Sequence, residues 1–143
     1  MGDALTFLLL PDAPGDALHW WQVADGRLIA DGAIYQATSD TEVILHLVAR
    51  SRRNRFVDRF IDALGQIEGG YAFVGMTNKK LIGARDPLGI RPLVLGELDG
   101  CPILASETCA LDIIGAKYIR DVENGEIVIC ELQPDGSVNV DSR

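Results

Sequence analysis

The chain has 143 residues, of which 48% are hydrophobic and 24% charged, so it can form one domain with a buried core and is too apolar to be disordered. Its formal net charge of −8 repels phosphate backbones, and no apolar run approaches the roughly 20 residues needed to span a bilayer. We therefore expect neither nucleic acid nor a membrane as partner. The start, Met1-Gly2-Asp3, has no basic segment typical of a signal peptide, and we expect a soluble, cytoplasmic protein.

Cysteines and histidines give no sign of a metal or a disulfide framework. The three cysteines, Cys101, Cys109 and Cys130, are odd in number and form no C-x-x-C pair. His19 and His46 are not spaced as metal ligands. We expect three buried, reduced thiols and no cofactor.

Residues 1–35 have the pattern of a β-meander. Three short apolar segments, 6–10, 18–23 and 27–34, are separated by the turn-forming runs PDAPGD and DG. Each segment is typical of a strand, and the third is interrupted at Asp31-Gly32.

Helical signals begin at Ser39. Ser39 and Glu42 have the spacing of a capping box, and an apolar run follows, which predicts a helix from Ser39 or Asp40 to about residue 53. A second helix is predicted over residues 55–67, where apolar residues recur at steps of three and four and Gly69-Gly70 follows.

The remainder of the chain has mainly strand patterns. Residues 71–76 and 80–85 predict a hairpin, Ser106 is a candidate cap for a short helix that ends at Gly115, and further strands are expected at residues 93–96, 102–105, 117–121, 126–132 and 138–140. Consecutive helices followed by hairpins favour an α+β fold, one domain over residues 1–143, with two packed antiparallel sheets and helices on the outside.

Four strings after residue 36 resemble a known family: SDTEV from Ser39, EGGYAF from Glu68, ARDPLGIRPL from Ala84 and ASETCALD from Ala105. RDVENGE from Arg120 extends the match. Together they resemble, over residues 37–132, the glutaminase domain of glutamine phosphoribosylpyrophosphate amidotransferases of purine biosynthesis. The resemblance implies the fold of an N-terminal-nucleophile hydrolase, with two antiparallel sheets between helical layers.

The same resemblance implies a catalytic centre that this sequence does not carry. The family's nucleophile is an N-terminal cysteine activated by its own α-amine, whereas this chain starts Met1-Gly2. Asp40 matches the family's aspartate that holds the α-ammonium group of glutamine. Helix capping by Asp40 is favoured over a retained substrate contact, so we expect no firm glutamine site. Arg85, Asp86, Arg91 and Glu107 are interpreted as a polar set that organises the central loop.

The sequence is therefore interpreted as a catalytically inactive scaffold in which residues 1–35, of different origin, precede an amidotransferase-like segment, 36–143. Such a protein is a chimera, natural or made in the laboratory. The alternatives are a degenerate natural domain that acts as an interaction module, and a residual glutaminase that uses Cys109 at a helix start. Because half of a two-sheet fold exposes strand edges, we expect self-association into a homodimer.

Overall fold

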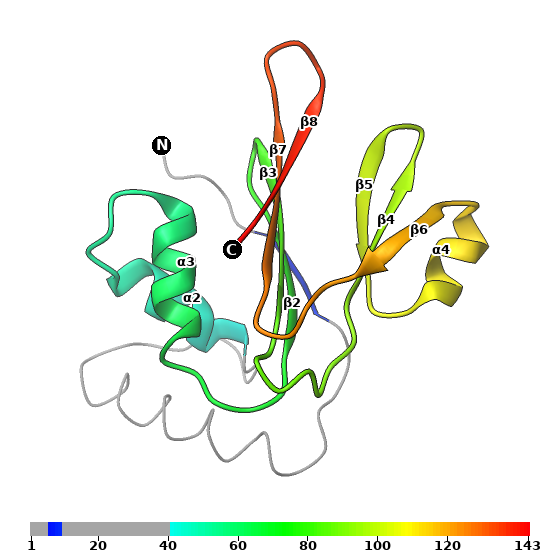
Figure 1. Cartoon of the computed structure of the whole chain (residues 1–143). Coiled ribbons are helices and arrows are strands. Elements are labelled where there is room, and N and C mark those ends of the chain that lie inside the picture. Colours follow the sequence, from blue (N-terminus) through cyan, green and yellow to red (C-terminus); the bar gives the residue numbers. More distant parts are fainter. Residues whose placement is uncertain (1–5, 10–40) are drawn as a thin grey trace. The chain divides into compact units, whose positions relative to one another are not determined.

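The computed structural model describes residues 6–9 and 41–143 (Figure 1). The chain divides into two compact units, one formed by Asp12–Gly69 and the other by Met1–Pro11 together with Gly70–Arg143. The predicted strands at 18–23 and 27–34, and the predicted cap residues Ser39 and Asp40, lie outside the described residues.

The unit of Asp12–Gly69 contains two described helices, α2 (Thr41–Arg50) and α3 (Phe56–Leu64), which pack against each other. Their apolar residues recur every three or four positions, so each helix has one buried face. The hydroxyl of Ser51, just after α2, donates a 2.8 Å hydrogen bond to the carboxylate of Asp62 in α3. The buried side chains of the pair are Val43, Ile44, Leu47, Val48, Val57, Phe60, Ala63 and Leu64.

The second unit contains a five-stranded sheet in which all neighbours are antiparallel and the order is β1-β2-β3-β7-β8. The predicted hairpin is confirmed, and its turn closes where the Thr77 amide donates to the Lys80 carbonyl at 2.8 Å. The strands are β1 (Thr6–Leu9), β2 (Ala72–Met76), β3 (Lys80–Arg85), β7 (Ile127–Leu132) and β8 (Val138–Ser142).

A three-stranded antiparallel sheet of order β5-β4-β6 completes this unit. Helix α4 (Thr108–Ile114) connects β5 to β6 and contacts both, with Leu111 as its one buried residue. The strands are β4 (Val94–Leu98), β5 (Cys101–Ala105) and β6 (Lys117–Asp121). Figure 1 shows this sheet in light green to orange, with α4 beside β6.

The two sheets share one core. Leu93 and Leu95, at the start of the smaller sheet, cluster with Val128 and Cys130 of β7, and Val122 joins them from the segment that links β6 to β7. All five are buried, with at most 6% of their surface exposed. The predicted α+β class, with two packed antiparallel sheets and three helices, is confirmed for the described residues.

Several predicted boundaries were wrong by a few residues. Helix α3 ends at Leu64 rather than residue 67, because Gly65 closes it and the next two amides bond to carbonyls only three residues back. Helix α4 is preceded by Glu107 rather than Ser106 as its N-cap residue, without a capping side-chain bond. Strand β1 pairs with β2, a long-range contact that the apolar pattern of the first residues did not reveal.

Candidate functional site

The residue that the resemblance assigns to substrate, Asp40, lies outside the described residues. Two polar centres fall within the described part of the chain. One is the loop that follows β3, and the other joins the end of β6 to the start of β7.

The loop after β3 is organised around the carboxylate of Asp86, which is fully buried. Its Oδ1 accepts hydrogen bonds from the backbone amides of Arg91 at 3.0 Å and Tyr71 at 3.3 Å, and its Oδ2 accepts one from Ile90 at 2.9 Å. Its backbone carbonyl also accepts bonds from the amides of Gly89 and Gly125. A buried carboxylate is tolerated only when it is satisfied in this way, so Asp86 holds the loop in one conformation.

Arg85 fixes the same loop from the preceding position. Its guanidinium donates to three backbone carbonyls, those of Arg91 at 2.8 Å, Val122 at 2.7 Å and Gly89 at 3.3 Å. A guanidinium has five donors and no acceptor, which suits it to gather carbonyl groups from separate segments. Arg85 therefore ties the loop to the segment between β6 and β7.

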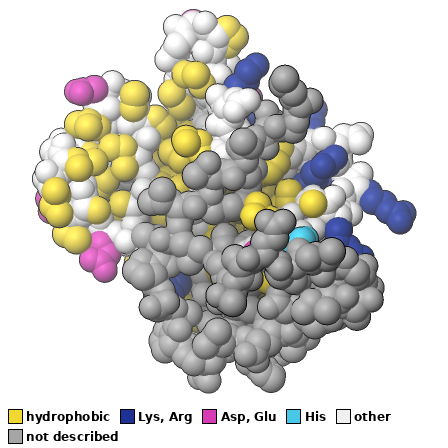
Figure 2. Space-filling model, turned by 180° about the vertical axis from the view of Figure 1, so that it is seen from behind, with side chains coloured by type: hydrophobic (Ala, Val, Ile, Leu, Met, Phe, Trp, Pro, Cys, Tyr) yellow, Lys and Arg dark blue, Asp and Glu magenta, His cyan; other side chains and the backbone are white. Residues whose placement is uncertain are grey.

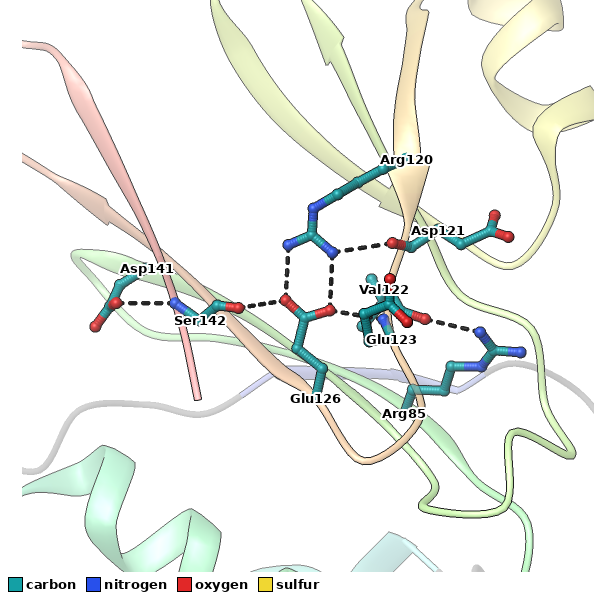
Figure 3. Close-up of polar contacts among 8 residues, drawn as sticks. All are labelled: Arg85, Arg120, Asp121, Val122, Glu123, Glu126, Asp141 and Ser142. Atoms are coloured by element: carbon teal, nitrogen blue, oxygen red, sulfur yellow. Dashed lines mark hydrogen bonds and ion pairs between the residues drawn. The ribbon is translucent and has the colours of Figure 1, made fainter.

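The second centre is the ion pair of Arg120 and Glu126 (Figure 3). The two guanidinium nitrogens meet the two carboxylate oxygens at 2.7 and 2.8 Å, which is the bidentate geometry of a strong pair. Glu126 also accepts the Glu123 amide at 2.6 Å and the hydroxyl of Ser142. Arg120 lowers the pKa of Glu126 to about 2, with further help from Ser142 and the Glu123 amide, against the opposing effect of burial.

The structure brings together three members of the predicted polar set and separates the fourth. Arg85 and Asp86 bond to the loop through their side chains, whereas Arg91 takes part through its backbone amide and carbonyl. Glu107 was wrongly grouped with them: it is exposed before α4, where its carboxylate accepts a 3.3 Å bond from the Cys109 thiol. Arg120 and Glu126 were not predicted as a pair. Their signal in the sequence is an acid directly after the turn at Asn124-Gly125, six residues from an arginine.

The prediction of three buried thiols is confirmed for Cys130 and wrong for Cys101 and Cys109. Cys130 is buried, but Cys101 and Cys109 are exposed, because Cys101 begins an edge strand and Cys109 lies in the first turn of the outward-facing helix α4. The hydrogen bond to Glu107, followed by desolvation, raises the pKa of Cys109, and burial raises the pKa of Cys130. Neither thiol is held in the anionic form that attacks an amide.

The side chains of these two centres form hydrogen bonds mainly within the protein, many of them to its own backbone. Within the described residues, the side chains of Asp86 and Arg85 form hydrogen bonds to main-chain atoms of the loop and its neighbours. The carboxylate of Glu126 accepts hydrogen bonds from one guanidinium, one amide and one hydroxyl. Among residues 6–9 and 41–143, no cluster of three or more His, Cys, Asp or Glu side chains is suited to a metal ion. Nor does that part of the chain contain a helix with the length and apolar character to cross a membrane.

Residues 22–112 match the family described as the glutamine amidotransferase domain. The chain is 70% identical over 117 residues, 82% of its length, to the amidophosphoribosyltransferase of Rhizobium etli, and 48% identical over 104 residues, 72% of its length, to that of Staphylococcus aureus. It covers 24% and 21% of these two relatives, so it spans between a fifth and a quarter of their length.

Solved structures give the same similarity. Glutamine phosphoribosylpyrophosphate amidotransferase from B. subtilis, complexed with ADP and GMP, superposes with a TM-score of 0.78 at 39% identity, over 85% of this chain and 26% of that one. A second structure, of the allosteric regulatory enzyme of purine biosynthesis, superposes with a TM-score of 0.77 at 39% identity, over 85% of this chain and 25% of the other.

Proposed function

The chain belongs to the glutamine amidotransferase family, and on that premise we propose that its described part is the scaffold of a glutaminase domain without a nucleophile of its own. Its sequence derives from the glutaminase domain of amidophosphoribosyltransferase, an enzyme of purine biosynthesis. The proposed role is to hold the two sheets and the central loop in place. The chain itself does not turn over glutamine.

The state of the thiols carries this proposal. Thiol attack on an amide needs a base that removes the proton, or surroundings that favour the thiolate. Cys109 instead donates to Glu107, a carboxylate whose charge opposes a neighbouring thiolate, and the pKa of Cys109 is raised. Cys130 lies in the apolar core between the sheets. Neither arrangement favours the thiolate form of Cys109 or Cys130 that would attack an amide.

We propose further that, in a chimeric chain, the segment of different origin is shorter than residues 1–35. The family match begins at residue 22, and the 117 residues aligned with the Rhizobium etli protein exceed the 107 that residues 37–143 can supply. Similarity thus extends upstream of Ala37, where the quoted motifs begin. We place the boundary of any foreign segment near residue 21, and assign residues 22–36 to the amidotransferase-like part.

The test is glutamine hydrolysis by the purified 143-residue chain, with ammonia as the readout. No ammonia above a no-protein background is expected, for the unaltered chain and for Asp40→Ala alike. Cys109→Ser and Cys101→Ser form a matched pair, because both thiols are exposed and only Cys109 lies at a helix start. Turnover that survives Cys101→Ser but disappears in Cys109→Ser would overturn the proposal in favour of a residual glutaminase.

An interaction module is the second candidate function, favoured by the apolar surface of α4 and β6. The last two residues of α4 are large aliphatic side chains exposed to solvent, Ile113 to 84% and Ile114 to 50%. Such a surface is typical of a protein contact. It does not require a catalytic centre, so both functions are compatible in one chain.

A further inference from the structure

Two surface features of the second unit have properties beyond holding the fold together. One is the apolar surface of α4 and the smaller sheet, visible at the left of Figure 2, which needs another molecule in order to act. The other is the turn between β6 and β7, where Asn124 and Gly125 are both exposed. An asparagine followed by a glycine can react with its own backbone and with water, so this turn needs no partner.

Asn124 has the neighbour that favours this reaction. The other three asparagines, Asn54, Asn78 and Asn139, are followed by residues with a long or branched side chain. Glycine has no Cβ, so its amide nitrogen is the least obstructed and its backbone turns most freely. In an unstructured chain, Asn124 is therefore the asparagine most prone to lose its amide group.

The reaction is deamidation through a cyclic imide. The amide nitrogen of Gly125 attacks Cγ of Asn124, the bond from Cγ to Nδ2 breaks, and ammonia leaves with the proton of the Gly125 amide. Water then opens the ring. Opening at Cγ gives aspartate, whereas opening at the main-chain carbonyl of Asn124 gives isoaspartate, in which the chain continues through the former side chain.

The geometry of the turn keeps the reacting atoms apart. The Glu126 amide donates to the Glu123 carbonyl at 3.1 Å, and Gly125 has φ of 76° while φ of Asn124 is negative. These features define a type II turn, in which ψ of the first central residue is about +120°. At that ψ the Gly125 nitrogen lies beside Hα of Asn124, whereas ring closure requires it beside Cβ.

The loop after β3 holds both reacting groups. The Gly125 amide donates to the backbone carbonyl of Asp86 at 3.1 Å. The side-chain amide of Asn124 lies against Gly89, so closely that a Cβ added at Gly89 would overlap it. Rotation of the turn into the reactive conformation breaks the first contact and moves the second, so the loop opposes it.

We propose that Asn124–Gly125 is a modification site that the loop after β3 protects: deamidation proceeds only from conformations in which this loop has moved away from the turn. Isoaspartate adds a main-chain atom to the turn, so the product cannot restore the bonds from Gly125 to Asp86 and from Glu126 to Glu123 together. The modification is therefore a one-way record of loop opening. It requires no catalytic residue and does not rest on the proposed function.

The first test compares the folded and the unfolded chain. The protein is incubated without glutamine in native buffer and in guanidinium chloride, and digestion followed by mass spectrometry measures the carboxylate formed at position 124. We expect the native rate to be lower by roughly tenfold or more, because only the opened fraction reacts. Equal rates would overturn the protection.

A matched pair of glycine variants then tests the loop. Gly89→Ala displaces the side chain of Asn124, whereas Gly100→Ala introduces a similar backbone strain with nothing within 4 Å of the new Cβ. We expect Gly89→Ala to deamidate about threefold faster or more in native buffer, and Gly100→Ala to stay within about twofold of the unaltered chain. Equal rates for the two variants would contradict a role of the loop.

Loss of global stability is controlled by Leu111→Ala, which removes a buried side chain of α4. We expect its rate to stay within about twofold of the unaltered chain, since the loop is unchanged. A rate that rises above that of Gly89→Ala would show that the reaction needs global unfolding, and the loop would not be the barrier. Circular dichroism confirms that each variant is folded, and the glycine pair decides the question if Leu111→Ala is not.

The position of the reaction is checked by charge and by ammonia. Deamidation at Asn124 adds one negative charge to the net charge of −8, which ion-exchange chromatography resolves, and releases ammonia. The four Asp-Gly pairs of the chain can rearrange but neither gain charge nor release ammonia. Asn124→Gln should abolish both signals, because a glutamine cannot close the same five-membered ring. Signals that persist in Asn124→Gln would assign the reaction to another residue and overturn the site.

Discussion

The loop after β3 and the α4–β6 segment both contain sequence motifs typical of the family, but the motif of the loop includes a buried side chain and the motif of α4–β6 is mostly exposed. The loop is built around Asp86, a fully buried carboxylate with three amide donors. The α4–β6 segment has one buried helix residue, Leu111, and leaves Glu107, Cys109 and Ile113 exposed.

The motifs of these two regions differ in what their side chains contact. In the loop, side chains satisfy the chain's own backbone, so the motif is explained within the described residues. In α4–β6, the side chains contact little else that is described, so the fold alone does not require them. The hydrogen bonds of the first motif hold its own loop, whereas most side chains of the second are exposed.

The largest expected effect is that of removing the centre of the loop. Asp86→Ala leaves three backbone amides without their acceptor in a buried site, and we expect a loss of about 3 to 4 kcal/mol of unfolding free energy. Urea denaturation followed by circular dichroism measures it. The matched control is Asp112→Ala, an exposed aspartate of α4, which should change stability by no more than about 0.5 kcal/mol.

A small effect at Asp86, below that at Asp112, would contradict the distinction between the two regions. Asp86→Asn sharpens the result. The asparagine side chain keeps one oxygen that can accept hydrogen bonds from backbone amides, but its NH2 group replaces the second oxygen and cannot accept. We expect Asp86→Asn to lie between the unaltered protein and Asp86→Ala.

Glu126 offers a smaller effect with a distinctive dependence on pH. Its pKa in the folded protein is about 2, below its value of 4.5 in the absence of folding. A carboxyl group with a depressed pKa stabilises the fold above its unfolded pKa, and that contribution disappears as pH falls through the folded value. The unaltered protein should therefore lose this stabilisation between about pH 5 and pH 2.

Glu126→Gln should lose about 2 kcal/mol at pH 7, less than the full shift implies, because Arg120 is 37% exposed and solvent screens the pair. The variant should also show a flatter dependence of unfolding free energy on pH below 5. Urea titrations at pH 7, 4 and 3 measure both. Parallel curves for the two proteins would show that the ion pair does not stabilise the fold.

The smallest expected effect compares two glycines of left-handed conformation. Gly89 in the loop has φ of 66° and Gly100 in the β4–β5 turn has φ of 80°. An alanine at either position is strained by about 1 kcal/mol. At Gly89 the added Cβ would also press on the side-chain amide of Asn124, whereas at Gly100 nothing lies within 4 Å.

Gly89→Ala should therefore be less stable than Gly100→Ala by about a further 1 kcal/mol. Thermal unfolding of the two variants side by side measures the difference. Equal melting temperatures would mean that Asn124 moves aside without cost, and that the loop is less tightly packed than its hydrogen bonds suggest.

Much of the fold was predictable because its signals are local. The hairpin from β2 to β3 was readable from apolar runs around Thr77-Asn78-Lys79, and the helix α3 from apolar residues at steps of three and four. Both depend on neighbours within a few residues. The pairing of β1 with β2, more than 60 residues along the chain, has no such local signal and was not predicted.

In the candidate site too, contacts between residues close in sequence were predictable and contacts between distant residues were not. That Arg85 and Asp86 organise the loop was predictable, because their bonds to Gly89, Ile90 and Arg91 stay within six residues. The exposure of Cys101 and Cys109 was not, because a cysteine's hydrophobic character does not say which face of a sheet or helix it occupies. The separate position of Glu107 depended on the direction in which α4 leaves the sheet.

The sequence by itself determined the family, the order of most elements and the charges of β6, since these are properties of residue identity and short-range spacing. Tertiary structure alone decided that β6 lies at an edge, that the carboxylate of Asp86 is buried, and that Arg120 meets Glu126 face to face. Each of these depends on which strands become neighbours, and strand neighbours are set by packing over the whole chain rather than by any local pattern.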